Sequence, residues 1–167
     1  MRAALDVRRA GPADAAAVLG MADALIQEDA GARDPITANL EWAGQYGDEH
    51  ITNLIVDERR IALLAELAGQ PVGALMGSLV DPTPFEPVLI GRLGSLYVVP
   101  EHRSDGVGAA LLSGFADWCR VQHVEVMQVT AYAGNDAAIR FYRRQGLEPH
   151  TLVLRSVPHL GSADPEI

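Results

Sequence analysis

Apolar runs of strand length set the strongest limit on how this chain folds. Four such runs, at residues 61–67, 72–80, 93–99 and 124–132, are separated by turn signals or by segments of helix length. The first two flank residues 68–71 (Ala-Gly-Gln-Pro), which form a hairpin signal, so at least part of the sheet is antiparallel. The pattern predicts an α/β fold and disfavours uniform parallel winding of the strands.

The remaining segments are typical of helices and loops. Pro12 opens an alanine-rich helix through about Gln27, and the polar residues 28–57 contain a second, less regular helical region. The proline-rich residues 81–87 cannot sustain a helix or a sheet ladder, so we expect a loop between the third and fourth strands.

The length of 167 residues suits a single domain. Residues 156–167 mix proline, glycine and charge without periodicity. We therefore expect one domain over residues 1–155 and a flexible C-terminal tail over residues 156–167.

The charged residues exclude several classes of function. The chain has 22 acidic and 13 basic residues and a formal net charge of -9. This balance repels a phosphate backbone, so we expect no nucleic-acid partner, whereas cationic amines are enriched near such a surface. Every basic residue is arginine, because the sequence contains no lysine. A Walker-type phosphate loop and Schiff-base chemistry, which need a lysine, are therefore excluded.

Cys119 is the single cysteine, which excludes an intramolecular disulfide and a cysteine-based zinc cluster. It falls on the apolar face of a helix, which is typical of a buried thiol and not of a nucleophile. The five histidines show no paired metal-ligand spacing, so we expect no metal. The N-terminus has no apolar signal core, and no stretch approaches the roughly twenty apolar residues of a membrane helix. We expect a cytoplasmic protein without a membrane partner.

Residues 93–112 indicate a strand, a stop and a helix. Pro100 ends the strand by removing a ladder donor, and Gly106 and Gly108 let the backbone approach a ligand closely. Apolar residues then recur at helical spacing, so free amides of the first helical turn face the loop and form an anion site. Arg103 adds a permanent charge suited to a phosphate oxygen. The segment predicts a pyrophosphate-binding loop, with a two-glycine surface turn as the alternative reading.

Residues 103–108 (Arg-Ser-Asp-Gly-Val-Gly) resemble the Arg/Gln-x-x-Gly-x-Gly/Ala signature of the GNAT superfamily of acyl-coenzyme A (CoA) dependent N-acetyltransferases. A second motif agrees in order and spacing. Asn135 resembles the family's cofactor-contacting asparagine, and residues 141–147 (Phe-Tyr-Arg-Arg-Gln-Gly-Leu) resemble its Phe-Tyr-x-x-x-Gly-Phe motif. Two departures stand beside these matches: Ser104 replaces a frequent glycine, and Asp105 puts a carboxylate in the phosphate loop.

The resemblance implies a mixed, mostly antiparallel sheet that is splayed between its fourth and fifth strands and flanked by helices. The pantetheine arm of acetyl-CoA would insert into this gap like a guest strand, and a backbone donor there would polarise the thioester carbonyl. The residues that would contact the cofactor are Leu96, Tyr97, Val98, Val99, Arg103, Ser104, Asp105, Gly106, Val107, Gly108, Ala109, Asn135 and Tyr142.

Two catalytic roles are implied. Tyr142 suits a general acid, because a phenol with a pKa near 10 holds its proton at neutral pH and gives it to a departing thiolate. A buried tyrosine that only packs is the alternative. We name Glu66 as general base, since its strand would border the cleft, with an exposed strand-end glutamate as the alternative. Glu28, Asp29 and Glu86 remain open as bases.

The implied activity is transfer of an acetyl group from acetyl-CoA to a primary amine of a small molecule, polycations included, by direct attack in a ternary complex. A non-catalytic acyl-CoA sensor or interaction module, and an enzyme acting on a protein amine, are the alternatives. We expect residues 28–57 to set the acceptor, with Trp42 and Tyr46 either lining its pocket or packing on a helix. The family suggests a homodimer.

Overall fold

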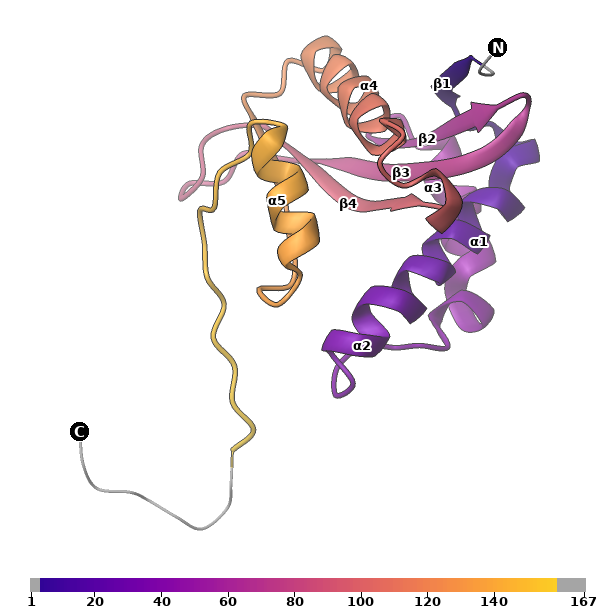
Figure 1. Ribbon diagram of the computed structural model, residues 1–167. Coiled ribbons are helices and arrows are strands. Elements are labelled where there is room, and N and C mark those ends of the chain that lie inside the picture. The colour runs from indigo at the N-terminus through magenta and orange to yellow at the C-terminus, as the bar shows by residue number, and fades with distance from the viewer. Residues whose placement is uncertain (1–3, 159–167) are drawn as a thin grey trace, which may run out of the picture.

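The computed structural model describes residues 4–158, and a five-stranded sheet forms its centre (Figure 1). The first four strands are antiparallel to their neighbours, and the fifth runs parallel to the fourth. Across the sheet the order is β1 (Leu5–Arg9), β2 (Arg60–Leu67), β3 (Gln70–Val80), β4 (Ile90–Val98) and β5 (Val126–Val129). The α/β class and the mixed, mostly antiparallel sheet are confirmed.

Helices cover both faces of the sheet (Figure 1). One face packs against α4 (Val107–Val121) and α5 (Asp136–Arg144), and the other against α1 (Ala15–Leu25) and α3 (Asp48–Val56). None of the helices within residues 4–158 is long and apolar enough to cross a membrane.

Burial on both faces explains why β2 has a continuous apolar sequence and not an alternating one. Ile61 and Leu63 belong to the core beneath α4, while Ala62 and Leu64 belong to the core beneath α1 and α3. The α4 side of the core also holds Cys119, which is 2% exposed. The prediction that this thiol is buried is confirmed.

The segment between α1 and β2 is the least regular part of the chain. After α1 the helix continues through the π-helical turn η2 (Ile26–Ala30) into the short α2 (Gly31–Arg33), and a second π-helical turn, η3 (Ala43–Gly47), precedes α3. The short 3-10 helices η1 (Pro12–Asp14) and η4 (Pro100–His102) precede α1 and follow β4. Such π-helical turns are frequent at functional sites, so η2 is a candidate part of one.

The hairpin between β2 and β3 is tighter than predicted. Only Ala68 and Gly69 form the turn, with φ of 49° and 76°, and β3 already begins at Gln70. Pro71 lies within the strand opposite Glu66, next to a bulge in the ladder. The bulge explains how a residue without an N–H is accepted there.

The two strands β4 and β5 separate early. They pair only over residues 90–93 of β4 and 126–129 of β5, although β4 runs on to Val98. The fifth strand is therefore shorter than the predicted 124–132, since its later residues have no ladder partner. The splay that the resemblance implied lies between Leu93 and Val98.

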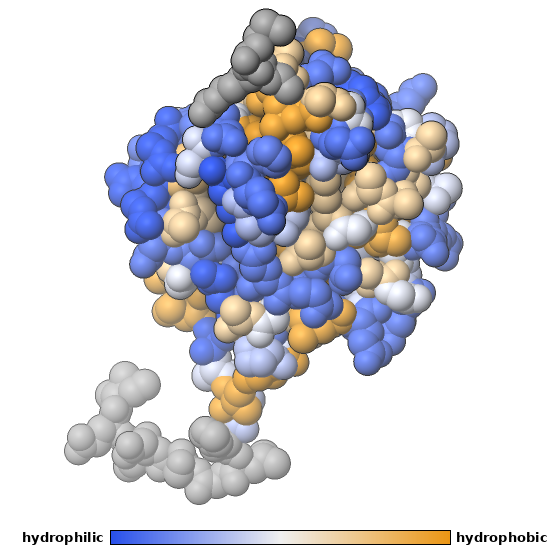
Figure 2. Space-filling model, turned by 45° about the vertical axis from the view of Figure 1, so that its right-hand side comes forward, coloured by the Kyte–Doolittle hydropathy of each residue, from blue (hydrophilic) through white to orange (hydrophobic). Residues whose placement is uncertain are grey.

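The predicted loop at residues 81–87 is confirmed, because it contains no helix or strand. Residues 145–158 also contain neither, and Arg155 ties them to the body through Asp34 (3.1 Å) and Thr37 (3.0 Å). Four apolar side chains of this segment are exposed: Leu152, Val153, Leu154 and Val157. Figure 2 shows hydrophobic residues on the part of the chain that extends below the body of the molecule. The division into a domain and a tail stays a prediction, and residues 159–167 of that tail lie outside the described residues.

Candidate active site

A cleft of about 970 Å³ opens where β4 leaves β5. One wall is α5 and the other is the α1, η2 and α2 segment, which lies across from it in Figure 1. The end of β4 and the loop before α4 complete the lining. The cleft therefore joins the two sequence motifs to the irregular segment after α1.

The N-terminus of α4 opens toward this cleft. Gly106 is the residue before the helix, with φ of 88°, and its carbonyl accepts the first helical hydrogen bond from Ala110 N–H at 3.0 Å. The N–H groups of residues 107–109 come before that bond and have no helical acceptor. Together with the positive helix end, they are suited to bind an anion.

Ser104 stands where the family signature often has glycine. Its φ is 71°, in the left-handed region where a side chain is costly, so the family's frequent glycine at this place has a steric reason. Asp105 does not line the cleft; its carboxylate lies 3.5 Å from His102 Nδ1 and is 45% exposed.

The guanidinium of Arg103 is held at three points. Its Nε donates to the carbonyl of Val98 at 3.0 Å, and Nη1 and Nη2 donate to the two oxygens of Glu28 at 2.6 and 2.8 Å. It also lies 5.5 Å from the centre of the Tyr97 ring. The ion pair raises the pKa of Arg103 and lowers that of Glu28. An incoming diphosphate would compete with Glu28 for this cation.

The backbone of β4 presents polar groups to the opening. Val99 N–H donates to Val72 O at 3.0 Å, so it points to β3 and away from the cleft. Because backbone groups alternate between the two sides of a strand, those of Leu96 and Val98 point to the cleft. The bond from Arg103 to Val98 O agrees with this direction.

Tyr142 lies on α5, half-buried against the core and edge-on to Phe141 at 5.1 Å between ring centres. Burial, and secondly the negative charge of Asp29, raise the pKa of Tyr142 to about 12. The phenol is thus held in its protonated form. That is the state required of a proton donor.

Asn135 has both ends of its side chain engaged. As the N-cap of α5, its Oδ1 accepts from Ala138 N–H at 3.1 Å, while its Nδ2 donates to Asp29 Oδ1 at 2.9 Å. The helix that Asn135 caps ends at Arg144, two residues before Gly146, whose φ is 88°. Asn135 therefore links α5 to η2 across the cleft.

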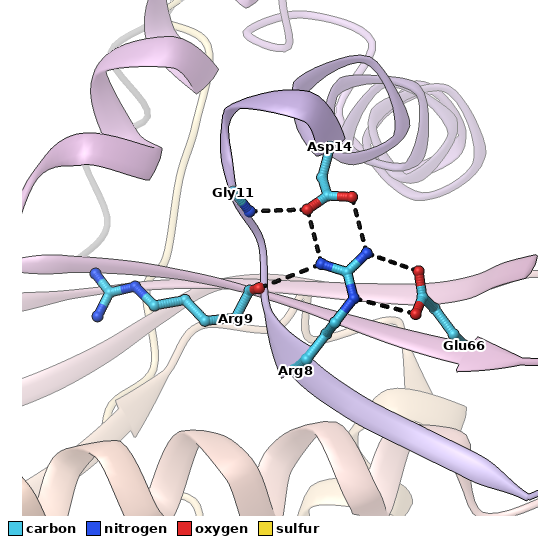
Figure 3. A network of polar contacts seen from close by, with 5 residues as sticks. All are labelled: Arg8, Arg9, Gly11, Asp14 and Glu66. Carbon is cyan, nitrogen blue, oxygen red and sulfur yellow. Dashed lines mark hydrogen bonds and ion pairs between the residues drawn. The ribbon is translucent and has the colours of Figure 1, made fainter. Parts of the chain in front are cut away.

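Glu66 lies elsewhere. Figure 3 shows it bound to Arg8, whose guanidinium donates to its two oxygens at 3.1 and 2.7 Å and also binds Asp14. Arg8 and the N–H of Gly11 lower the pKa of Asp14 to about 2. Glu66 does not line the cleft, so the structure does not bring it together with Tyr142.

Ten of the thirteen residues predicted to contact the cofactor line the cleft. Asp105, described above, and two others do not. Val99 and Val107 are absent from the lining, the latter because its side chain is buried in the core. The predicted residues in the lining are Leu96, Tyr97, Val98, Arg103, Ser104, Gly106, Gly108, Ala109, Asn135 and Tyr142. Their role in binding a cofactor stays a prediction.

Neither aromatic residue considered for the acceptor pocket lines the cleft. Trp42 packs against the α1 and α3 side of the core and lies edge-on to His50, and Tyr46 is 60% exposed. The sequence reasoning missed Arg33 and Tyr132, which do line it. The spacing of Asp29 and Arg33, four residues apart, was the available signal for Arg33.

Residues 4–158 contain no group of three or more His, Cys, Asp or Glu side chains that could hold a metal ion.

Comparison with known proteins agrees with this geometry. Residues 24–147 match the model of the acetyltransferase (GNAT) family. An uncharacterized N-acetyltransferase of Archaeoglobus fulgidus is 29% identical over 85 residues, which is 51% of this chain and 58% of that protein. An L-methionine sulfoximine/L-methionine sulfone acetyltransferase of Pseudomonas aeruginosa is 33% identical over 88 residues, 53% of this chain and 50% of that protein. The chain thus spans about half the length of these relatives.

Solved structures extend the likeness in fold. The BH1408 protein of Bacillus halodurans, as a tetramutant, superposes with a TM-score of 0.81 at 16% identity, covering 92% of this chain and 99% of that one. The protein AAC(6')-Iy, in complex with the bisubstrate analogue CoA-S-monomethyl-acetylneamine, superposes with a TM-score of 0.71 at 16% identity, covering 93% of this chain and 99% of that one. At these identities the likeness concerns the fold alone.

Proposed function

Because the chain belongs to the GNAT family of acetyltransferases, we propose that it transfers an acetyl group from acetyl-CoA to a primary amine of a small molecule. The amine attacks the acetyl group directly while both substrates are bound. One observation supports the proposal: residues at the N-terminus of α4, namely Gly106, Gly108 and Ala109, line the same cleft as Tyr142.

The cleft residues fit the parts of acetyl-CoA. The amides of residues 107–109 and the guanidinium of Arg103 would hold the diphosphate. The backbone groups of Leu96 and Val98 would bond the amides of the pantetheine arm, as a neighbouring strand does. Acetyl-CoA supplies the acetyl group as a thioester, whose sulfur is the leaving atom.

Tyr142 would protonate that sulfur. As the bond between the amine nitrogen and the carbonyl carbon forms and the carbon–sulfur bond breaks, the electron pair of the broken bond passes to sulfur, which takes the phenolic proton. The nitrogen sheds a proton on becoming an amide, and this proton restores the phenol. Burial of Tyr142 keeps it neutral until that moment.

The amine, which arrives as an ammonium, must lose another proton before it attacks. Glu66, our expectation from the sequence, is bound to Arg8 away from the cleft. Asp29 is better placed, because it lines the cleft and no hydrogen bond from the described residues reaches its Oδ2. We therefore assign it the first proton, which then passes to solvent.

The test is CoA release with acetyl-CoA and a panel of amines, run beside calorimetric binding of acetyl-CoA. Turnover that falls in Tyr142→Phe, at unchanged cofactor affinity, would support the proposal. Binding without turnover on any amine would favour a non-catalytic acyl-CoA sensor. Absence of both binding and turnover would refute the proposal itself.

A further inference from the structure

We propose that the acceptor is a zwitterion of the α-amino acid type, whose ammonium binds Asp29 and whose carboxylate binds Arg33. The inference rests on the proposed function and names the acceptor class of the same cleft. It follows from where these two side chains lie, from how they are paired, and from the charge of the cleft around them.

Asp29 and Arg33 lie together on the wall that faces α5. Asp29 belongs to the π-helical turn η2 and Arg33 ends α2, and both line the cleft. Tyr142 lines the same cleft, and the charge of Asp29 contributes to the raised pKa of its phenol. An ammonium on Asp29 would thus be held in the cleft that contains the proposed proton donor.

The pair is bonded on one side only. Arg33 Nη1 donates to Asp29 Oδ1 at 2.6 Å, and Asn135 donates to that same oxygen. Among the described residues nothing else bonds Asp29 Oδ2 or the remaining nitrogens of Arg33. The side chains are 23% and 34% exposed, so both charges are within reach of a ligand. A zwitterion would meet an anion and a cation already set side by side.

Asn135 makes the carboxylate a fixed target. Its own orientation is set by the N-cap bond to Ala138, and its amide then holds Asp29 Oδ1. A carboxylate fixed by two donors loses less freedom on binding an ammonium than a mobile one does. Asn135 acts here as a positioning residue for Asp29.

The charge of the cleft separates a zwitterion from a polycation. Two carboxylates line it, Glu28 and Asp29, and each is already paired with an arginine. Arg144 lines the cleft as a third arginine, so the lining carries more cations than anions although the whole chain has a net charge of -9. Each further ammonium of a polycation would meet this excess of arginines, whereas the carboxylate of a zwitterion brings an anion to Arg33.

The experiment compares matched acceptors on the full chain. Each of a set of α-amino acids is assayed for CoA release beside its carboxamide and its decarboxylated amine, and aminoglycosides form a separate arm. We expect kcat/KM at least tenfold higher for the best amino acid than for its two analogues or any aminoglycoside. This comparison needs no variant, so it holds even where a substitution impairs folding.

Two variants locate the effect. In Arg33→Gln we expect KM for the amino acid to rise about 10- to 100-fold, with KM for its carboxamide unchanged within about threefold, because only the lost carboxylate contact differs. Asp29→Asn lowers kcat for every acceptor and is partly rescued at high pH, where the free amine needs no base. Arg140→Gln and Asp23→Asn, which remove the same charges outside the cleft lining, are the controls.

The outcomes distinguish failure of the acceptor inference from failure of the proposed function. Carboxamides or aminoglycosides turned over as well as amino acids would overturn the inference while leaving the proposed function standing. So would an Arg33→Gln variant, folded by its melting curve, whose KM rises equally for acid and carboxamide. No turnover of any acceptor by a chain that binds acetyl-CoA would instead remove the proposed function.

Discussion

Arg103 and Glu28, 75 residues apart in the chain, meet across the cleft in a two-point ion pair with bonds of 2.6 and 2.8 Å. The cation that the first motif assigns to the diphosphate is therefore already occupied by a carboxylate. Binding of acetyl-CoA has to exchange one anionic partner of Arg103 for another. The strength of the pair sets how much of the cofactor's binding free energy this exchange consumes.

Glu28→Gln should bind acetyl-CoA more tightly, with Kd lower by roughly three- to tenfold, because the neutral amide competes less for Arg103. Calorimetry measures the change. Glu41→Gln, which removes an equal charge from an exposed position within residues 28–57, should leave Kd unchanged. Weaker binding by Glu28→Gln would mean that the ion pair belongs to the cofactor-bound conformation.

Tyr142→Phe should lower kcat by about 10² to 10⁴, with Kd for acetyl-CoA within about threefold of the parent value. A pKa raised from 10 to about 12 keeps the phenol protonated as the pH rises, so loss of this proton should not reduce kcat below about pH 10. A pH profile of kcat from pH 6 to 10 tests this. If kcat declines at alkaline pH and the decline disappears in the phenylalanine variant, the pKa of Tyr142 is lower than about 12.

Two substitutions in the phosphate loop should act in opposite directions. Gly106→Ala puts a side chain at φ of 88° and should lower stability by about 1 kcal/mol, although the added Cβ meets no atom within 4 Å. Ser104→Gly removes a side chain from φ of 71° and should be neutral or stabilising. Melting temperatures of the two variants measure both effects. Equal destabilisation by both would refute a steric origin at this loop.

Asp14→Asn should reveal a pH-dependent contribution to stability. The pKa of Asp14 is lowered from 3.8 to about 2 by Arg8, so its ionised form stabilises the fold above about pH 4, and this contribution is lost as the pH falls through about 2. At pH 7 we expect the variant to lose about 1 kcal/mol, or about 3 °C in Tm. The difference from the parent should shrink between pH 4 and pH 2.

Asp117→Asn is the control for that series. Asp117 pairs with Arg120 on the surface of α4, where the side chains are 59% and 73% exposed, so screening leaves little stability to lose at any pH. A loss of Tm as large as that of Asp14→Asn would contradict the distinction between the two pairs.

Local signals predicted much of the fold. Pro100 and Gly106 mark the end of β4 and the start of α4, and Asn135 and Gly146 bracket α5, because prolines, left-handed glycines and capping side chains act within a few residues of where they stand. The hairpin was predicted with too long a turn, since the bulge that accepts Pro71 depends on the opposite strand.

Contacts between residues far apart in the sequence could not be predicted from such local signals. Glu66 was placed beside the cleft because its strand was known but its partner was not; the bond to Arg8, 58 residues away, depends on β1 being the edge neighbour of β2. The bond between Asn135 and Asp29 spans 106 residues and depends on the π-helical turn, for which the sequence has no marker.

The buried thiol of Cys119 has a practical consequence. The pKa of Cys119 is raised to about 11 by burial, and α4 packs its sulfur so closely over Gly91 that a Cβ there would lie 2.6 Å away. Thiolate is the form that reacts with alkylating reagents, so modification has to wait until α4 lifts from the sheet. Since the chain has no other cysteine, the rate of alkylation measures how often α4 separates from the sheet. A compound that binds only the closed protein would lower this rate of alkylation.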